Sequence, residues 1–465
     1  MRFRNERKIL SNSSSESNRA LRRDALEILK AAVDSVDPGE AVRRNLHVKG
    51  GILSCRGLTY DLTRGGRMHV IGGGKAGAAM AEAVWGLLGD RVDGGFINIP
   101  EGSDAPTEIG RIHLNRASHP VPDRGSVAGV ESMLSMTEGV GEEDFVIVLI
   151  SGGGSALMTC PAEGVSLEDV KALTQLLLLS GASIDELNAV RKHVSAFKGG
   201  QLARRLHPSR VLGLVLSDVI GDPLETIASG PTSPDTTTYG DSVEVLRRYR
   251  LLGSAPAPVL DRLQRGARGE LEETPKPGDP IFDRVENVII GGNTTALEAA
   301  AGRAEALGYS STIVTSTLSG EAVEAGRYLA DYVRTAHSPG DPQRSPEAAI
   351  FGGETVVVVT GSGVGGRNQE VALSAAQGLA GLEALIATMA TDGVDGPSEA
   401  AGAIVDGATL KRASSLGLDA SRHLTENDSY GFFSRLGDAL ITGPTGTNVN
   451  DVSVALMPRS LPDGG

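Results

Sequence analysis

The chain has 465 residues, which is too long for a single compact core and suits two domains with a cleft between them. A formal net charge of -14 excludes non-specific binding to nucleic acids or membranes, since both need a basic surface. No apolar run approaches the ~18 residues of a membrane span, and the cysteines, Cys55 and Cys160, are too few for a disulfide framework, so we expect a cytoplasmic protein.

The N-terminal stretch, residues 1–23, is charged and lacks an apolar segment, so we expect a disordered tail or an extended start there. A local pattern then recurs in which a β-branched strand runs into a glycine-rich turn, usually followed by a helical stretch. It appears over residues 68–88, 144–158, 211–222, 285–307 and 354–376. This alternation predicts an α/β fold with parallel sheets, whose binding crevice is formed by the loops at the carboxyl ends of the strands.

Two passages interrupt this alternation. Between residues 241 and 284 a short amphipathic stretch gives way to a Pro- and charge-rich sequence, which predicts a linker between two domains. A polar stretch over residues 337–347 predicts a surface loop.

The first glycine-rich turn spans Gly72 to Gly77 and matches GxGxxG at the start of a predicted helix. Amides of Gly73 and Gly74 and the helix N-terminus would favour a phosphate there. The turn is not a Walker loop, because Ala76 stands where a Ser or Thr would reach magnesium. A lysine inside a dinucleotide fingerprint is also unusual, and residues 361–366 match the same pattern, although one chain rarely carries two such cofactors.

Single cations accompany two of these turns. Lys75 lies within the first, and Arg367 follows the loop that contains Gly363 and Gly365. A third turn offers amides and hydroxyls without a cation, from Ser151, Gly152, Gly153, Gly154 and Ser155. For any one loop, a tight turn explains the glycines as well as phosphate binding does. Recurrence over several loops favours phosphate binding.

One predicted helix carries a polar face made of Asn188, Arg191 and Lys192, at positions i, i+3 and i+4. An arginine fork suits a carboxylate, and Asn188 could bind hydroxyls, so these residues are candidates for substrate binding. A solvated basic face is the competing interpretation, and it is favoured when the helix is considered without the neighbouring loops.

Phosphoryl transfer needs Mg²⁺ held by one or two carboxylates and the substrate phosphates. Asp218 with Asp222, and Asp392 with Asp395, each follow a predicted strand. Turn chemistry competes equally for Asp222 and Asp395, so we predict Asp218 and Asp392 as metal ligands, with Asp218 also a catalytic candidate. The histidines show no paired metal spacing, and we expect His119 and His193 to be structural.

Taken together, these motifs resemble the glycerate 2-kinases that carry a C-terminal MOFRL domain. The resemblance runs from about residue 18 to residue 456 and rests on ordered strings that include GGGKAGAAMAEA, SGGGSALM, LNAVRKHVSAFKGGQLA, GSGVGGRNQEVALSAA and GTNVND. It implies a Rossmann-like doubly wound parallel sheet over residues 18–240 and a smaller MOFRL α/β domain with a mixed sheet over residues 285–457.

The resemblance further implies ATP-dependent phosphorylation of D-glycerate to 2-phosphoglycerate, with a divalent cation, in a cleft between the domains. The family's essential lysine falls on Lys75 and its essential arginine on Arg367. We expect both cations to neutralise charge on the transferring phosphoryl, while Arg191 and Asn188 hold the carboxylate and hydroxyls of glycerate.

Two alternatives remain open at this level. An NAD(P)-dependent hydroxypyruvate reductase would use Gly72 to Gly77 as its fingerprint and Asp90, Asp93 or Glu101 for the ribose. A non-catalytic sugar-phosphate sensor would use the same loops without chemistry. The partners expected are small molecules, and the sequence leaves a homodimer open.

Overall fold

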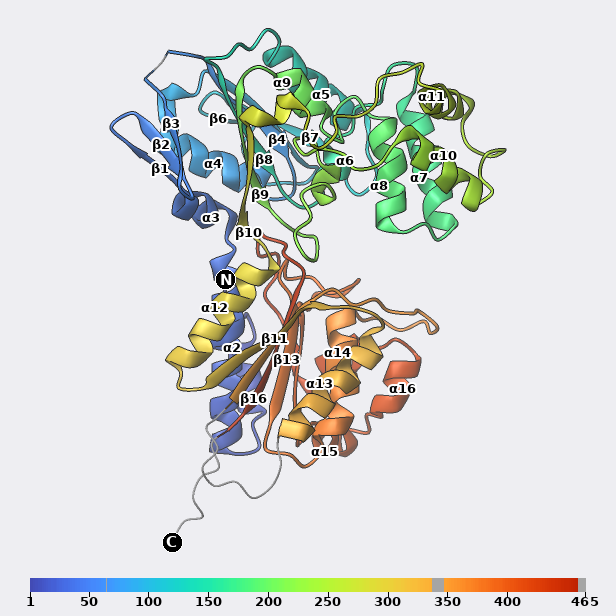
Figure 1. Cartoon of the computed structure of the whole chain (residues 1–465). Helices are drawn as coiled ribbons and strands as arrows, with labels where there is room; N and C mark the ends of the chain where they lie inside the picture. The colour runs from blue at the N-terminus through green and yellow to red at the C-terminus, as the bar shows by residue number, and fades with distance from the viewer. Residues whose placement is uncertain (64, 337–346, 459–465) are drawn as a thin grey trace. The chain divides into compact units, whose positions relative to one another are not determined.

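The computed structural model of the chain describes residues 1–63, 65–336 and 347–458. Most of the predicted surface loop, residues 337–346, therefore lies outside the described residues. The chain divides into two compact units (Figure 1). We call residues Pro38–Ile290 the central unit, and Met1–Asp37 together with Gly291–Gly465 the terminal unit. The prediction of a two-domain α/β protein is confirmed.

The central unit is built on a seven-stranded sheet in the order β10-β9-β8-β4-β5-β7-β6. Its strands are β4 (Met68–Gly73), β5 (Gly94–Pro100), β6 (Glu108–Ile109), β7 (Ile112–Ala117), β8 (Phe145–Ile150), β9 (Arg210–Leu216) and β10 (Val285–Gly291). Strands β9, β8, β4, β5 and β7 pair in parallel, and β6 is antiparallel to β7. Every residue of β4 and β8 is buried, as expected of continuous apolar strands in the middle of a parallel sheet.

Further elements complete this unit. A separate antiparallel sheet holds β1 (Leu46–Lys49), β2 (Ile52–Cys55) and β3 (Leu58–Asp61). The helices outside the cluster described next are α3 (Pro38–Asn45), α4 (Gly77–Leu88), η1 (Gly89–Arg91), α5 (Arg124–Met136), α6 (Gly154–Leu157), α9 (Gln201–Leu206), η2 (Ile227–Ser229) and η3 (Pro280–Arg284).

A cluster of helices, green in Figure 1, has an apolar core of its own. It consists of α7 (Leu167–Leu179), α8 (Ile184–His193), α10 (Tyr239–Arg248) and α11 (Ala257–Ala267). Residues 241–284 were predicted to be a linker between domains. In the structure this segment holds α11 and most of α10 and belongs to the central unit. Val259 and Leu263, one helical turn apart, are fully buried in the cluster, a signal that the Pro-rich composition obscured.

The terminal unit has a six-stranded mixed sheet in the order β11-β12-β16-β13-β14-β15. Its strands are β11 (Ser310–Leu318), β12 (Glu347–Gly353), β13 (Leu385–Ala390), β14 (Gly402–Asp406), β15 (Ala439–Leu440) and β16 (Asp451–Met457). Its helices are α1 (Glu6–Ser11), α2 (Glu16–Ser35), α12 (Asn293–Ala306), α13 (Ala322–Ala336), α14 (Arg367–Leu379), α15 (Thr409–Ser415), α16 (Ala420–Thr425) and α17 (Ser429–Leu436). Only β11 and β12 pair in parallel among these described strands, so the predicted mixed sheet is confirmed. Helices α2 and α12 cover one face of the sheet, and α13 and α14 cover the other (Figure 1).

The expected disordered or extended start is wrong. Residues 1–37 carry α1 and α2, and Ser15 caps α2 by accepting a hydrogen bond of 3.0 Å from the backbone N–H of Asn18. Leu21, Ile28 and Leu29 of α2 are buried, because α12 and β16 supply the apolar surface that this helix needs. That surface is distant in sequence, so the charged composition of the start gave no sign of it.

A second expectation fails at residues 354–376. The valine run after Glu354 was predicted to be a strand, but the strand is β12, which ends at Gly353, and Val356 forms only an isolated bridge with Glu321. Val358 and Val359 are exposed. The predicted helix after the glycine loop does form, as α14.

Among the described residues, no helix is both long and apolar enough to cross a membrane.

Arg22 anchors α2 to the rest of the terminal unit. Its side chain is fully buried, and its guanidinium donates to Asp406 and Asp438 at 3.0 Å and 2.8 Å. Asp438 also accepts a hydrogen bond from Arg412 at 2.7 Å. Charges this deeply buried are tolerated only when each one is paired.

We therefore expect Arg22→Met to lower the free energy of unfolding by about 3 to 5 kcal/mol, because it leaves buried carboxylates undercompensated. Urea denaturation followed by circular dichroism measures this change. Arg19→Met, on the same helix but exposed, is the matched control and should change stability by less than about 0.5 kcal/mol. A loss below about 1 kcal/mol for Arg22→Met would contradict the anchoring role.

Candidate active site

The two glycine-rich turns of the central unit are joined to each other at the carboxyl ends of the neighbouring strands β4 and β8. The backbone N–H of Lys75 donates to the carbonyl of Gly152 at 2.8 Å, and that of Ala76 donates to Ser151 Oγ at 3.1 Å. Gly74 has a φ of +146°, and a Cβ on it would lie 2.1 Å from Ser151 Oγ. A side chain at this position would push the loops apart, so close approach explains this glycine.

Three side chains gather around the second turn, Ser151 to Ser155. A Cβ on Gly152 would lie 2.5 Å from Asp218 Oδ2, and one on Gly153 would lie 2.9 Å from the His119 ring and 3.4 Å from Lys75 Cγ. The sheet thus brings Lys75 and Asp218 to one loop, as the alternating sequence predicted. Burial, and then the charge of Lys75, lowers the pKa of His119. This histidine is therefore a neutral neighbour of the lysine at pH 7.

A hydrogen-bond network that includes Ser229 links Asn188 and Arg191 to Ser155. Arg191 Nη2 donates to Asn188 Oδ1 at 3.0 Å and to Ser229 Oγ at 2.9 Å, and Ser229 Oγ lies 2.9 Å from Ser155 Oγ. The buried Arg191 Nε has no hydrogen-bond partner among the described residues. Burial lowers the pKa of Arg191 to about 10, since no carboxylate offsets it. Neutral groups orient this guanidinium, so its positive charge remains available to bind an anion.

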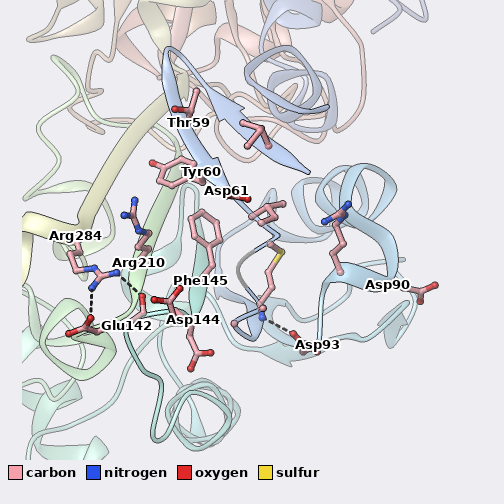
Figure 2. Close-up of a pocket in the computed structure, with 17 residues that line it drawn as sticks. Thr59, Tyr60, Asp61, Asp90, Asp93, Glu142, Asp144, Phe145, Arg210 and Arg284 are labelled. Atoms are coloured by element: carbon pink, nitrogen blue, oxygen red, sulfur yellow. Dashed lines mark hydrogen bonds and ion pairs between the residues drawn. The ribbon is translucent and has the colours of Figure 1, made fainter. Parts of the chain in front are cut away.

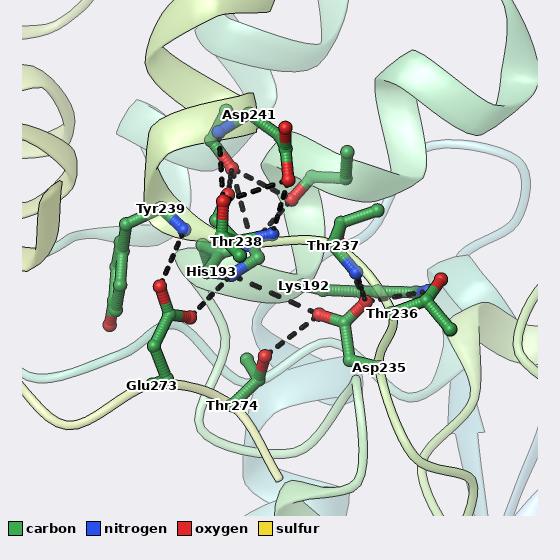
Figure 3. Close-up of polar contacts among 12 residues, drawn as sticks. Lys192, His193, Asp235, Thr236, Thr237, Thr238, Tyr239, Asp241, Glu273 and Thr274 are labelled. Atoms are coloured by element: carbon green, nitrogen blue, oxygen red, sulfur yellow. Dashed lines mark hydrogen bonds and ion pairs between the residues drawn. The ribbon is translucent and has the colours of Figure 1, made fainter. Parts of the chain in front are cut away.

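Lys192 is not brought to this group. Its ammonium donates to Asp235 Oδ1 at 3.2 Å, and both side chains are buried. Figure 3 shows the two side chains directed toward each other. Such a pair fixes α8 to the segment after η2 and leaves the lysine unsuited to bind substrate.

His193 lies in the same polar network (Figure 3). Its Nε2 lies 3.1 Å from Glu273 Oε2, and its ring packs edge-on against Tyr239. Burial raises the pKa of Glu273, but hydrogen bonds from His193 and from the Tyr239 N–H lower it overall, to about 2. These contacts agree with the structural role expected of His193.

In the terminal unit, Arg367 is the first residue of α14 and is held by acids. Its Nε and Nη2 donate to the two oxygens of Asp451 at 2.6 Å and 2.9 Å, and its Nη1 lies 2.9 Å from Glu354. Burial raises the pKa of Asp451, the hydrogen bonds from Arg367 lower it, and the result is about 6. Asp395 caps α14 by accepting from the backbone N–H groups of Asn368 and Gln369 at 3.0 Å and 2.9 Å.

The other residues predicted as site residues in this unit have local structural roles. Asp392 accepts from the Val394 N–H at 3.0 Å, the short-range bond of a turn. A Cβ on Gly363 would lie 2.4 Å from Asp428, and one on Gly365 would lie 2.1 Å from Ser429. Close packing therefore accounts for both glycines, and their roles in phosphate binding stay predictions.

A cavity of about 510 Å³ lies elsewhere, at the amino ends of β4, β8 and β9 (Figure 2). Its lining includes Asp90 and Asp93, and Arg284 pairs there with Glu142. The glycine turns lie at the other ends of these strands, so this cavity is separate from the predicted site. Asp90 and Asp93 are therefore badly placed to serve as the ribose acid of a nicotinamide cofactor.

No group of three or more His, Cys, Asp or Glu side chains in the described residues is arranged to hold a metal ion. Mg²⁺ is commonly bound through one or two carboxylates together with substrate phosphates. Asp218, half-buried beside Gly152, fits that mode.

Sequence reasoning missed four polar residues of these sites: Ser229, Lys198, Glu354 and Asp451. Lys198 and Asp451 lie inside two of the strings that carry the family resemblance, LNAVRKHVSAFKGGQLA and GTNVND. Their spacing matches no catalytic pattern, because each acts through a partner that is distant in sequence.

Comparison with known proteins matches both parts of the chain. Residues 24–264 match a domain of unknown function (DUF4147), and residues 347–451 match the MOFRL family. A protein named glycerate 2-kinase from Pyrococcus horikoshii is 42% identical over 94% of this chain and 97% of its own length. D-glycerate 2-kinase from Thermotoga maritima is 42% identical over 94% of this chain and 99% of its own length.

The fold of this chain is also similar to that of a solved glycerate kinase. The crystal structure of glycerate kinase from Thermotoga maritima superposes with a TM-score of 0.83 at 40% identity, covering 94% of this chain and 99% of that chain. The paired glycine turns, the DUF4147 and MOFRL matches and the full-length similarity lead to one conclusion: this chain belongs to the MOFRL-containing family of glycerate 2-kinases.

Proposed function

We propose that this protein transfers the γ-phosphoryl group of ATP to the 2-hydroxyl of D-glycerate and so forms 2-phospho-D-glycerate. The observation that carries the proposal is the pair of hydrogen-bonded glycine turns with Lys75 and Asp218 beside them. The N–H groups of the first turn, from Gly74 to Ala76, already donate within the protein, so we assign the phosphate oxygens to the second turn, Ser151 to Ser155, with its hydroxyls. Lys75 beside that turn offsets the charge of a polyphosphate. The similarity to named glycerate kinases supports the choice of acceptor.

Each side chain has a proposed role. Lys75 and Arg367 act on the transferring phosphoryl, because this chemistry depends on positioning and on charge neutralisation. Arg191 binds the carboxylate of glycerate. Asn188 and Ser229 orient the guanidinium of Arg191. Asp218 would hold Mg²⁺, which when bound supplies neutralisation of the phosphate oxygens.

The proposal is tested by incubating the purified protein with ATP, Mg²⁺ and D-glycerate and following the product by phosphorus NMR. We expect a phosphomonoester signal whose coupling assigns it to carbon 2. A signal on carbon 3 would overturn the regiochemistry, and oxidation of NADH with hydroxypyruvate in place of phosphorylation would overturn the reaction class.

We expect Lys75→Ala and Arg367→Ala each to lower kcat at least about 100-fold, because each removes a cation proposed to stabilise the transition state. Steady-state kinetics on folded protein measures this. Lys49→Ala and Arg422→Ala each remove an exposed cation of the same type from the same unit as matched controls, and should keep near wild-type kcat. Near wild-type turnover in either site variant would reject the role of that cation.

The pKa of about 6 at Asp451 predicts an acid limb in the pH profile of kcat. Above pH 6 Asp451 is ionised and holds Arg367 by two hydrogen bonds. As the pH falls through 6 the carboxyl takes up a proton, the pair weakens, and we expect kcat to fall. The limb should be absent from Asp451→Asn, measured between pH 5 and 8, and an unchanged limb in this variant would assign it to another group.

A further inference from the structure

A second, small cavity in the central unit adjoins the turn at Ser155. Arg191 and Lys198 line it together with Ser155, Thr159 and Ser195. Among the described residues, no Asp or Glu is part of its lining. The cavity therefore contains two basic side chains and no acidic one.

Lys198 is buried, with 4% of its surface exposed, and follows the helix of Arg191. Its ammonium donates to the carbonyl of Ser155 at 2.7 Å and to that of Met158 at 3.0 Å. An ammonium has three N–H donors, so one is left over after these two bonds. Burial, and then the charge of Arg191, lowers the pKa of Lys198 strongly, and an anion bound beside the two groups would restore the protonated form of the lysine.

Arg191 is half-buried as a residue, and it too lacks a carboxylate partner among the described residues. Its Nη2 bonds are made to an amide and a hydroxyl, and its buried Nε has no partner among the described residues. Buried charges in proteins are normally paired, because removing them from water costs several kcal/mol. Two neighbouring cations with neutral partners and unused donors form a site that favours an anion.

We propose that Lys198 and Arg191 together form the subsite for the carboxylate of the hydroxy-acid substrate, with the third N–H of Lys198 and Nε of Arg191 as donors. This inference rests on the proposed function and adds Lys198 as a substrate-contacting residue. Lys198 also donates to the carbonyl of Ser155, in the second glycine-rich turn. The carboxylate of the substrate would therefore be held at a fixed position relative to that turn. The site thereby selects an acid over a neutral polyol of the same size.

The test compares Lys198→Met with Lys198→Gln. The glutamine side chain keeps N–H donors for the two carbonyls but carries no charge, so a purely structural lysine predicts near wild-type kinetics for it. The carboxylate subsite predicts that both variants raise KM for D-glycerate about 10- to 100-fold and change KM for ATP less than about 3-fold. Lys171→Met, at the surface of α7, is the matched control and should leave both values unchanged. A KM for D-glycerate within twofold of wild type in a folded variant would overturn the proposal.

The wild-type protein gives a measurement that needs no variant. Calorimetric titration without nucleotide should show D-glycerate binding at least about 100-fold more tightly than glycerol, which lacks the carboxylate. Equal affinities would overturn the subsite even if the variants do not fold. Failure to phosphorylate D-glycerate would instead reject the proposed function, and the titration would still decide whether this cavity binds a carboxylate.

Discussion

The candidate site depends on how closely two backbone segments can approach each other at the ends of β4 and β8. The bond from the Lys75 N–H to the Gly152 carbonyl and the contact of Gly74 with Ser151 hold the two turns as one surface. Side chains at these glycines would separate the turns. Close packing of the two turns therefore requires the glycines, and the same packing places Lys75 beside the turn that we propose for phosphate binding.

The basic side chains in the interior of the molecule differ in whether a carboxylate lies beside them. Arg22 and Lys192 are buried against carboxylates, and these pairs fix α2 and α8 to their surroundings. Lys198 is buried and Arg191 is half-buried at a cavity beside the turn at Ser155, and neither forms an ion pair among the described residues. Because unpaired buried charge opposes folding, its retention at one place points to a ligand of opposite charge.

Arg367 shows an intermediate arrangement. It is held by Asp451 and Glu354, yet its guanidinium is only partly buried at the start of α14. A helix start favours anions, so both the guanidinium and the backbone there suit a phosphate. The two carboxylates keep the arginine in one orientation and partly neutralise the local positive charge.

The sequence by itself determined the α/β class, the strands β4, β8 and β9, and the turns with Lys75 and Asp218, because these depend on local periodicity and on glycine placement. It could not determine that residues 1–37 fold with residues 291–458, or that α10 and α11 form a helical cluster, because the apolar surfaces that bury them come from distant segments. The tertiary structure also decided that adjacent Arg191 and Lys192 have different surroundings: neighbours on a helix point about 100° apart, so one lines a cavity and the other meets Asp235.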